Sequence, residues 1–341
     1  MHRHLLRAAV LAASLLSSTG LSAAAPIERE LVIDEALALI KAQYVFPERY
    51  EAIEQSVRKH QQAGEYAAAA SEEEFVKLVT THLRDITHDG HMGLKYQPKV
   101  RDFRPAAFTI TPAQREQERR ENYGLNKVEV LPGNVGYLNV IQFHDVENAR
   151  DTIAAAMAFL SNTDALIIDL RDNRGGNGES MQLLASYFFK DVLTLMELRF
   201  RGQKPEQART YAEVSGKRYL DKPVYVLTSG RTFSAGEAFV HALQSRKRVT
   251  LVGATTRGAG NPNTMLPVRT DYLLSVPIGE SVNPVTGSGW EGVGVKPDVA
   301  VADKAALGIV HRRALETLRD GAKDEALRTS LVKQIEALDK S

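Results

Sequence analysis

Three short stretches of the chain combine a possible nucleophile, histidines, carboxylates and glycines at spacings that suit catalysis. They are THDGHMGL at residues 87–94, DLRDNRGGN at 169–177 and TSGRTFSAGE at 228–237. Each follows a predicted helix or strand, so a rigid element would hold its polar side chains in place. The chain contains no cysteine, which excludes thiol nucleophiles, thiolate metal sites and disulfides.

The stretch at 228–237 places Ser234 at the predicted start of a helix. Free N–H groups and the helix dipole stabilise negative charge at such a position. A serine there could attack a carbonyl carbon, and the N–H of Ala235 would face the resulting oxyanion. Ser234 and Glu237 also fit the S-x-x-E capping box, which needs no catalytic role. Both interpretations remain open from this stretch alone.

The stretch at 169–177 ends a predicted buried strand with the pair Gly175 and Gly176. Paired glycines let backbone N–H groups approach a ligand closely, so one of them could supply a second oxyanion donor. The alternative is a tight turn between strand and helix. Neither G-x-x-x-x-G-K-[ST] nor G-x-G-x-x-G occurs here, which argues against a phosphate-binding loop.

In the first stretch and the helix before it, His82, Asp85, His88 and His91 recur at steps of three. Steps of three drift by roughly 60° each around a helix of 3.6 residues per turn, so we expect no metal site. We expect Gly90 to end the helix before His91. His91 then lies in a glycine-flanked turn and is the candidate base, whereas His82 and His88 are expected at the surface.

The predicted elements that would position these stretches divide the chain in two. Residues 27–86 show apolar positions at helical spacing, which predicts a small helical domain. Residues 97–127 are polar and charged, which is typical of a solvated linker or an exposed helix. From Asn134 onward, strands alternate with helices, and this pattern favours an α/β fold with a largely parallel sheet.

The expected boundaries follow the apolar pattern. Strands are predicted at 135–143, 165–170, 223–228 and 249–252, with helices at 146–160, 178–189 and 234–244. A hairpin is predicted from 265–268 and 272–276, followed by two closing helices at about 304–320 and 323–338.

The N-terminus has the features of an export signal. Arg3 and Arg7 precede a short apolar run at 8–16, and small residues allow cleavage after Ala24. The alternative is an uncleaved anchor. No later stretch is long enough to span a membrane. We therefore expect a soluble protein, periplasmic or secreted, with no integral membrane segment after signal removal.

Charge argues against two classes of partner. The formal net charge is +1, and removing Arg3 and Arg7 with the signal leaves it near −1. Such a balance argues against nucleic acid or an anionic membrane as the main partner.

Together the stretches resemble the S41 family of serine peptidases, the C-terminal-processing and tricorn-core group. D-L-R-x-N-x-G-G at 169–176 and T-S-x-x-T-x-S-A-G-E at 228–237 are similar to its two main motifs. D-G-H-M-G-L at 89–94 resembles the histidine motif of the branch that includes tricorn core peptidases and interphotoreceptor retinoid-binding protein modules. W-E-G-V-G-V-K-P-D at 290–298 resembles the closing motif, so the likeness covers roughly 85–300.

The resemblance implies an α/β fold: a ClpP/crotonase-like β/β/α spiral core with a small N-terminal helical domain. The interval between Leu94 and Val135 is too short for the PDZ domain that many family members carry there, so we expect none. The predicted organisation is a signal peptide at 1–24, a helical domain at 25–96, a linker at 97–133, a peptidase core at 134–303 and closing helices at 304–341.

The resemblance also implies site residues. Ser234 would be the nucleophile, and the N–H of Ala235 with that of Gly175 or Gly176 would form the oxyanion hole. Processing peptidases of the family use a Ser–Lys dyad, with the lysine in a G-K-G context. Here that position is Ala259, which excludes the dyad, and the nearby Arg257 stays protonated and is a poor base.

The tricorn-like arrangement then remains. His91 would be the general base, and Glu291 would orient or charge-stabilise it, directly or through another group. In tricorn a serine precedes the histidine and helps in that relay, whereas here Gly90 stands in that place. Asp89 is the second candidate for orienting His91. Because free histidine titrates at about pH 6.5, we expect activity to rise through roughly pH 6–7.

These features predict an exported serine peptidase that hydrolyses peptide bonds in peptides or unfolded proteins through an acyl-enzyme, without metal or organic cofactor. The alternative is a non-catalytic protein that binds apolar ligands on the same fold, as retinoid-binding relatives do. The presence of Ser234, His91 and the paired glycines favours the enzyme, because a pure binder needs none of them.

Overall fold

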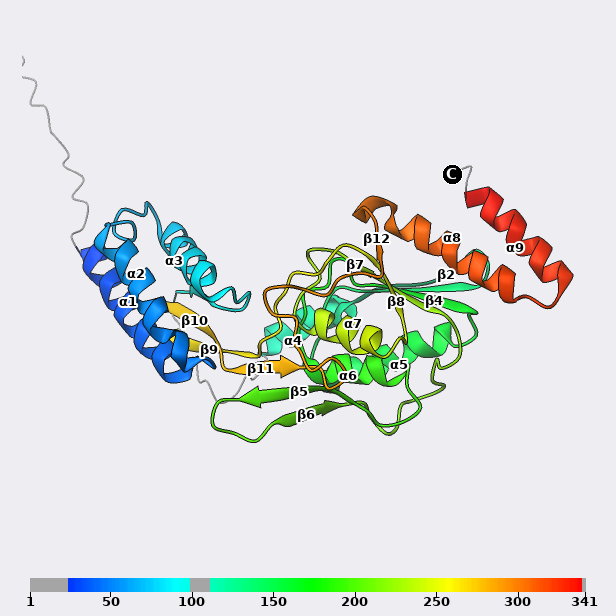
Figure 1. Cartoon of the computed structure of the whole chain (residues 1–341), viewed down its shortest axis with the longest axis horizontal. Coiled ribbons are helices and arrows are strands. Elements are labelled where there is room, and N and C mark those ends of the chain that lie inside the picture. The colour runs from blue at the N-terminus through cyan, green and yellow to red at the C-terminus, as the bar shows by residue number, and fades with distance from the viewer. Residues whose placement is uncertain (1–23, 99–110, 339–341) are drawn as a thin grey trace, which may run out of the picture.

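The computed structural model describes residues 24–98 and 111–338 (Figure 1). The predicted signal peptide lies outside the described residues except for Ala24, which begins the first helix. Three helices open the described chain: α1 (Ala24–Gln43), α2 (Tyr50–Gln62) and α3 (Glu72–Thr87), with a short 3-10 helix, η1 (Pro47–Arg49), before α2. In Figure 1 they lie at the opposite end of the molecule from the C-terminal helix.

The N-terminal helices pack on a small antiparallel sheet, which the sequence did not predict for this region. The sheet has the order β1–β10–β9 and consists of β1 (Gly93–Tyr96), β10 (Tyr272–Pro277) and β9 (Asn263–Val268). The hairpin predicted from residues 265–276 is therefore confirmed, and it packs into the same hydrophobic cluster as α1, α2 and α3. The N-terminal helices and the hairpin β9–β10, which are far apart in sequence, thus share one hydrophobic core.

The central sheet has six strands in the order β12–β8–β7–β4–β3–β2. These are β2 (Leu125–Leu131), β3 (Val135–Val140), β4 (Ala165–Asp169), β7 (Val224–Thr228), β8 (Thr250–Gly253) and β12 (Val299–Ala300). All neighbouring pairs are parallel except β2 with β3, so the expected largely parallel sheet is confirmed.

The expected linker at 97–133 is wrong for its last part, because β2 lies there and pairs with β3. Gly133 and Asn134, both at positive φ, make the tight turn between the two strands. Earlier in the same interval, α4 (Pro112–Arg120) begins with a capping box from Thr111 and is followed by η3 (Asn122–Gly124). The exposed helix considered for this stretch is therefore present, while residues 99–110 lie outside the described part of the chain.

Helices cover both faces of the central sheet, and its inner strands β3, β4 and β7 bury side chains on both sides. Leu166 and Ile168 of β4 join the cluster formed with α5 (Val146–Leu160), α6 (Gly178–Ser186) and α7 (Ala235–Ser245). Ile167 points to the opposite cluster, formed with α8 (Asp303–Gly321) and α9 (Glu325–Leu338). Figure 1 shows these two helix layers on either side of the sheet.

A third, antiparallel sheet was not predicted from the sequence. It has the order β11–β5–β6 and consists of β11 (Gly279–Val282), β5 (Thr194–Phe200) and β6 (Glu206–Arg209). The predicted α/β class with an N-terminal helical region is confirmed. Over residues 24–98 and 111–338, no helix combines the length and the apolar character needed to cross a membrane.

Candidate active site

Ser234 lies in the sharp turn between β7 and α7, where the sequence predicted it. Its backbone has φ 49° and ψ −114°, a conformation that L-residues rarely adopt. Such strain persists only where surrounding structure imposes it, and it is concentrated at functional sites. The turn leaves Ser234 partly exposed at the start of a helix whose first residue is Ala235.

Glu237 holds this turn in place through hydrogen bonds. Its side chain is fully buried and accepts the N–H of Ser234 at 2.9 Å, which is one half of the predicted capping box. The same carboxylate accepts the N–H groups of Gly258 and Ala259 at 2.6 and 2.9 Å, and the hydroxyl of Thr256 at 2.6 Å. Burial raises the pKa of Glu237, and these hydrogen bonds oppose that rise. The capping interpretation and the nucleophile interpretation are therefore compatible.

His91 lies next to Ser234, although it comes from the N-terminal region. Its Nε2 is 3.2 Å from the Oγ of Ser234, and its ring packs 4.8 Å from that of Phe233. Helix α3 ends at Thr87, and His88, with a left-handed φ of 55°, is its C-cap, so the expectation that the helix ends before His91 is confirmed. The loop from His88 to His91 carries the imidazole across to the core.

The environment of His91 favours the neutral imidazole. Burial, followed by the charge of Arg84, lowers its pKa to about 4, so the assumption that it titrates like a free histidine is wrong. A neutral ring can accept a proton from Ser234 at neutral pH. Its Nδ1 is buried and has no hydrogen-bond partner among the described residues.

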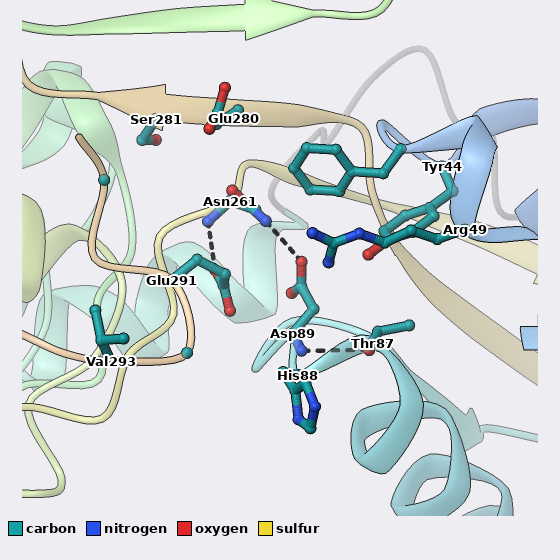
Figure 2. A pocket seen from close by; sticks show the side chains of 13 residues that line it. Tyr44, Arg49, Thr87, His88, Asp89, Asn261, Glu280, Ser281, Glu291 and Val293 are labelled. Atoms are coloured by element: carbon teal, nitrogen blue, oxygen red, sulfur yellow. Dashed lines mark hydrogen bonds between the residues drawn. The ribbon is translucent and has the colours of Figure 1, made fainter. Parts of the chain in front are cut away.

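Figure 2 shows the carboxylates of Asp89 and Glu291 on either side of Asn261. Asp89 accepts the N–H of His91 at 2.9 Å and the side-chain amide of Asn261 at 2.8 Å. Glu291 accepts the N–H groups of Gly90, Gly260 and Asn261 at 2.9, 2.5 and 2.8 Å.

Neither carboxylate forms a hydrogen bond with the imidazole ring of His91, although their oxygens and a ring nitrogen lie within 4.8 Å of one another. The contact of Glu291 with His91 therefore runs through the backbone of Gly90. A cavity of about 480 Å³ adjoins both carboxylates. Burial raises the pKa of Asp89, and burial together with the Asp89 charge raises that of Glu291 to about 7.

The structure separates the two candidate glycines of the oxyanion hole. The N–H of Gly175 donates to the side-chain oxygen of Asn173 at 2.9 Å and is occupied. Within the described part of the chain, the N–H groups of Gly176 and Ala235 have no acceptor. Gly176 is exposed and lines a pocket shared with Ser234, so the geometry favours Gly176 with Ala235 as the two donors.

The loop that carries His91 packs against Ala259, the position that the resemblance assigns to the dyad lysine. Ala259 is fully buried, and a Cβ built on Gly90 would lie 2.9 Å from its Cβ. The loop that carries His91 therefore fills the space beside position 259. Arg257 lies with its guanidinium 5.6 Å from the centre of the Phe233 ring, and forms no hydrogen bond with Ser234.

A second pocket, of about 260 Å³, is lined by Ser234 but not by His91. Its lining is largely apolar and includes Met181, Met196, Leu198, Ala238 and Trp290. Met196 and Leu198 belong to β5, which the sequence did not predict. This pocket has the shape and polarity for an apolar side chain next to the nucleophile.

The residues His82, Asp85, His88 and His91, which are spaced by three in the sequence, do not come together at one site. His88 is exposed as expected, but His82 is not a surface residue: its side chain is 12% exposed and its ring stacks 3.5 Å from that of His60. Among the described residues, two groups bring possible metal-ligand atoms within 4.8 Å: His60 with Glu65 and His82, and Asp89 with His91 and Glu291. In the second group, backbone N–H groups already occupy the carboxylate oxygens.

Two family models match the sequence of this chain. The family model described as peptidase family S41 matches residues 134–301, and that described as the N-terminal domain of peptidase S41 in eukaryotic IRBP matches 28–132. The carboxy-terminal-processing protease of Bartonella bacilliformis is 28% identical over 178 residues, which cover 50% of this chain and 39% of that protein. The chloroplastic carboxyl-terminal-processing peptidase 1 of Arabidopsis thaliana is 32% identical over 180 residues, covering 52% and 35%. The chain thus matches well under two thirds of either relative.

Solved structures show the same fold. A putative peptidase from Parabacteroides merdae superimposes with a TM-score of 0.61 at 17% identity, covering 87% of this chain and 98% of that one. The tricorn protease superimposes with a TM-score of 0.51 at 14% identity, covering 92% of this chain and 37% of tricorn.

Proposed function

The chain belongs to peptidase family S41, and on that premise we propose that it is an exported serine peptidase acting through Ser234 and His91. The observation that carries the proposal is the distance of 3.2 Å between His91 Nε2 and Ser234 Oγ. The two residues come from different parts of the fold and meet at a strained turn, which a purely structural role would not require. The predicted signal at 1–24 supports export.

The proposed reaction is hydrolysis of a peptide bond in two steps. Ser234 Oγ attacks the carbonyl carbon while its proton passes to Nε2 of His91. The C–N bond then breaks, and the imidazolium gives that proton to the leaving amine. In the second step, water attacks the acyl-enzyme, His91 takes the water's proton, and Ser234 recovers it as the acid product leaves.

Two features would stabilise the charges that form. The free N–H groups of Gly176 and Ala235 would receive the oxyanion, because both lie beside Ser234. The imidazolium would be stabilised by Asp89 and Glu291, whose oxygens lie within 4.8 Å of the ring. Glu291 also holds the N–H of Gly90, so we assign it a positioning role towards His91.

The apolar pocket next to Ser234 would receive the substrate side chain on the acyl side of the cut bond. Peptides or unfolded proteins are the expected substrates, because an extended chain must reach the paired N–H groups of the turn. We retain the proposed division into a helical domain at 25–96, a core at 134–303 and closing helices at 304–341, with the interval before the core shortened by β2.

The test is hydrolysis of an unfolded protein by wild type and by Ser234→Ala, followed by mass spectrometry of the products. The wild type should release peptides and the variant should release none, while its melting temperature stays close to that of the wild type. Equal product patterns would overturn the proposal. Binding of apolar ligands without any cleavage by the wild type would favour the non-catalytic alternative.

A further inference from the structure

A pocket of about 380 Å³ adjoins the Ser234–His91 pair on the histidine side. Three cationic side chains line it: Arg84 from α3, Lys95 from β1 and Arg174 from the loop after β4. Among its described lining residues there is no aspartate or glutamate. Three separate elements thus bring positive charge to one place beside the nucleophile.

None of these cations forms an ion pair in the described structure, although Asp89 lies close enough to interact electrostatically with Arg84. Arg84 is half-buried, and its one hydrogen bond runs from Nε to the carbonyl of Met92 at 2.9 Å. Lys95 and Arg174 are exposed and form no ion pair with any described residue. By contrast, Arg171 and Arg231 are each paired with aspartates. Unpaired cations around a concavity create a positive potential that favours an anion.

The chemistry of the pair fixes which part of a substrate enters this pocket. His91 must protonate the leaving amine, so the chain beyond the cut bond passes on its side. His91 lines the cationic pocket but not the apolar one, whereas Ser234 lines both. The apolar pocket is therefore on the acyl side and the cationic pocket is on the leaving side.

We propose that Arg84, Lys95 and Arg174 bind a carboxylate carried by the leaving segment of the substrate. The inference rests on the proposed peptidase function and adds a substrate class to it. The carboxylate can come from the free end of a chain or from an aspartate or glutamate side chain a residue or two beyond the cut. Arg84 is the strongest anchor, because a partly buried guanidinium forms stronger charge-assisted hydrogen bonds than exposed cations do.

Such binding would also act on catalysis. The charge of Arg84 lowers the pKa of His91. A carboxylate on Arg84 offsets this charge, so His91 becomes a stronger base when a suitable substrate is bound. Substrates that carry the carboxylate should then show a higher kcat as well as a lower KM.

The experiment measures binding separately from turnover, by calorimetry on Ser234→Ala. The ligands are acetyl-Ala-Ala-Leu-Ala-Ala with a free carboxylate and the same peptide as its amide. A second pair, both amides, carries Glu or Gln directly after Leu. The matched variant adds Lys95→Met and Arg174→Gln, which removes two exposed cations and leaves Arg84 and its bond to Met92 intact. The control adds Lys333→Met on the distant α9.

We expect at least one carboxylate ligand to bind about tenfold more tightly than its neutral partner. That preference should fall to about fourfold in the double cation variant, which keeps Arg84, and persist unchanged with Lys333→Met. Discrimination within the first pair identifies the chain end as the source, and discrimination within the second identifies a side chain. Equal binding within both pairs, or a preference untouched by the double variant, overturns the inference.

If wild type cleaves these peptides without discrimination, the peptidase survives and the pocket assignment fails. If Ser234→Ala distinguishes the charged from the neutral peptides but wild type cleaves none of them, the carboxylate-binding assignment stands and the proposed peptidase function fails.

Discussion

The backbone of Gly90 packs directly against the side chain of Ala259, so that a Cβ on Gly90 would lie 2.9 Å from the Cβ of Ala259. This contact joins the loop that carries His91 to the segment held by Glu237, which also holds Ser234. It therefore couples the two halves of the proposed catalytic pair.

Gly90→Ala should destabilise the protein by about 1–3 kcal/mol through overpacking, because both neighbours are held by hydrogen bonds to buried carboxylates. Gly90 lies outside the left-handed region, so the new side chain adds no backbone strain. Adding Ala259→Gly should recover about 1 kcal/mol or more, since it removes the atom that clashes. Urea unfolding of the single and double variants measures this coupling. A double variant no more stable than Gly90→Ala alone would show that the contact does not constrain the loop.

Gly236→Ala should damage the oxyanion hole without touching Ser234. Its Cβ would lie 2.4 Å from the side-chain oxygen of Asn173, which holds the N–H of Gly175. We expect a loss of about 1–3 kcal/mol in stability and, as the glycine turn shifts, a fall of tenfold or more in the rate of serine acylation.

The matched control is Gly308→Ala in α8, where a new Cβ meets nothing within 4 Å. That change should leave acylation unaltered and stabilise the helix by about 0.5–1 kcal/mol. Equal acylation by both variants would contradict the assignment of the Gly175–Gly176 turn to the oxyanion hole.

Glu291 should make stability depend on pH. Burial and the Asp89 charge raise its pKa from 4.5 to about 7, so the folded state holds this proton more tightly than the unfolded state. Its contribution is therefore full below about pH 4.5 and is lost as pH rises through about 7. Relative to Glu291→Gln, the wild type should lose about 1–3 kcal/mol of unfolding free energy between pH 4.5 and 7.5.

Glu280→Gln is the control for this measurement, because Glu280 lines the same cavity and is only partly buried. Because Glu280→Gln removes the same type of side chain from the same cavity, it shows how much of the pH dependence belongs to position 291. A difference between wild type and Glu291→Gln that is independent of pH, or of opposite sign, would contradict the raised pKa of Glu291.

The sequence predicted the parts of the site that depend on local pattern. The strand–turn–helix around Ser234 and the largely parallel sheet follow from apolar runs and glycine positions. The choice between Gly175 and Gly176 could not be predicted, because it depends on where the side chain of Asn173 points. The lowered pKa of His91 likewise arises from tertiary burial, which a motif does not encode.

Other features were missed because their signals are short or distant. Strand β2 lies in the expected linker, although Gly133 and Asn134 before β3 carry the signal of a tight turn. Strand β5 supplies the apolar pocket, but its residues alternate only in part and its partners lie far along the chain. The cationic pocket gathers Arg84, Lys95 and Arg174 from three separate elements, and no local pattern joins them.

The most direct test of the Ser234–His91 pair is the rate and site of acylation by a fluorophosphonate, measured from pH 4 to 9. Label should map to Ser234 in the wild type and be absent from Ser234→Ala. Because burial lowers the pKa of His91 to about 4, the loss of rate attributable to its protonation should lie below about pH 5. His91→Ala should lower the rate by about two to four orders of magnitude, and His88→Ala, at an exposed position, should leave it unchanged. Acylation of Ser234 in His91→Ala at near the wild-type rate, or a wild-type rate that rises only above about pH 8 as for a lysine or thiol base, would contradict the account.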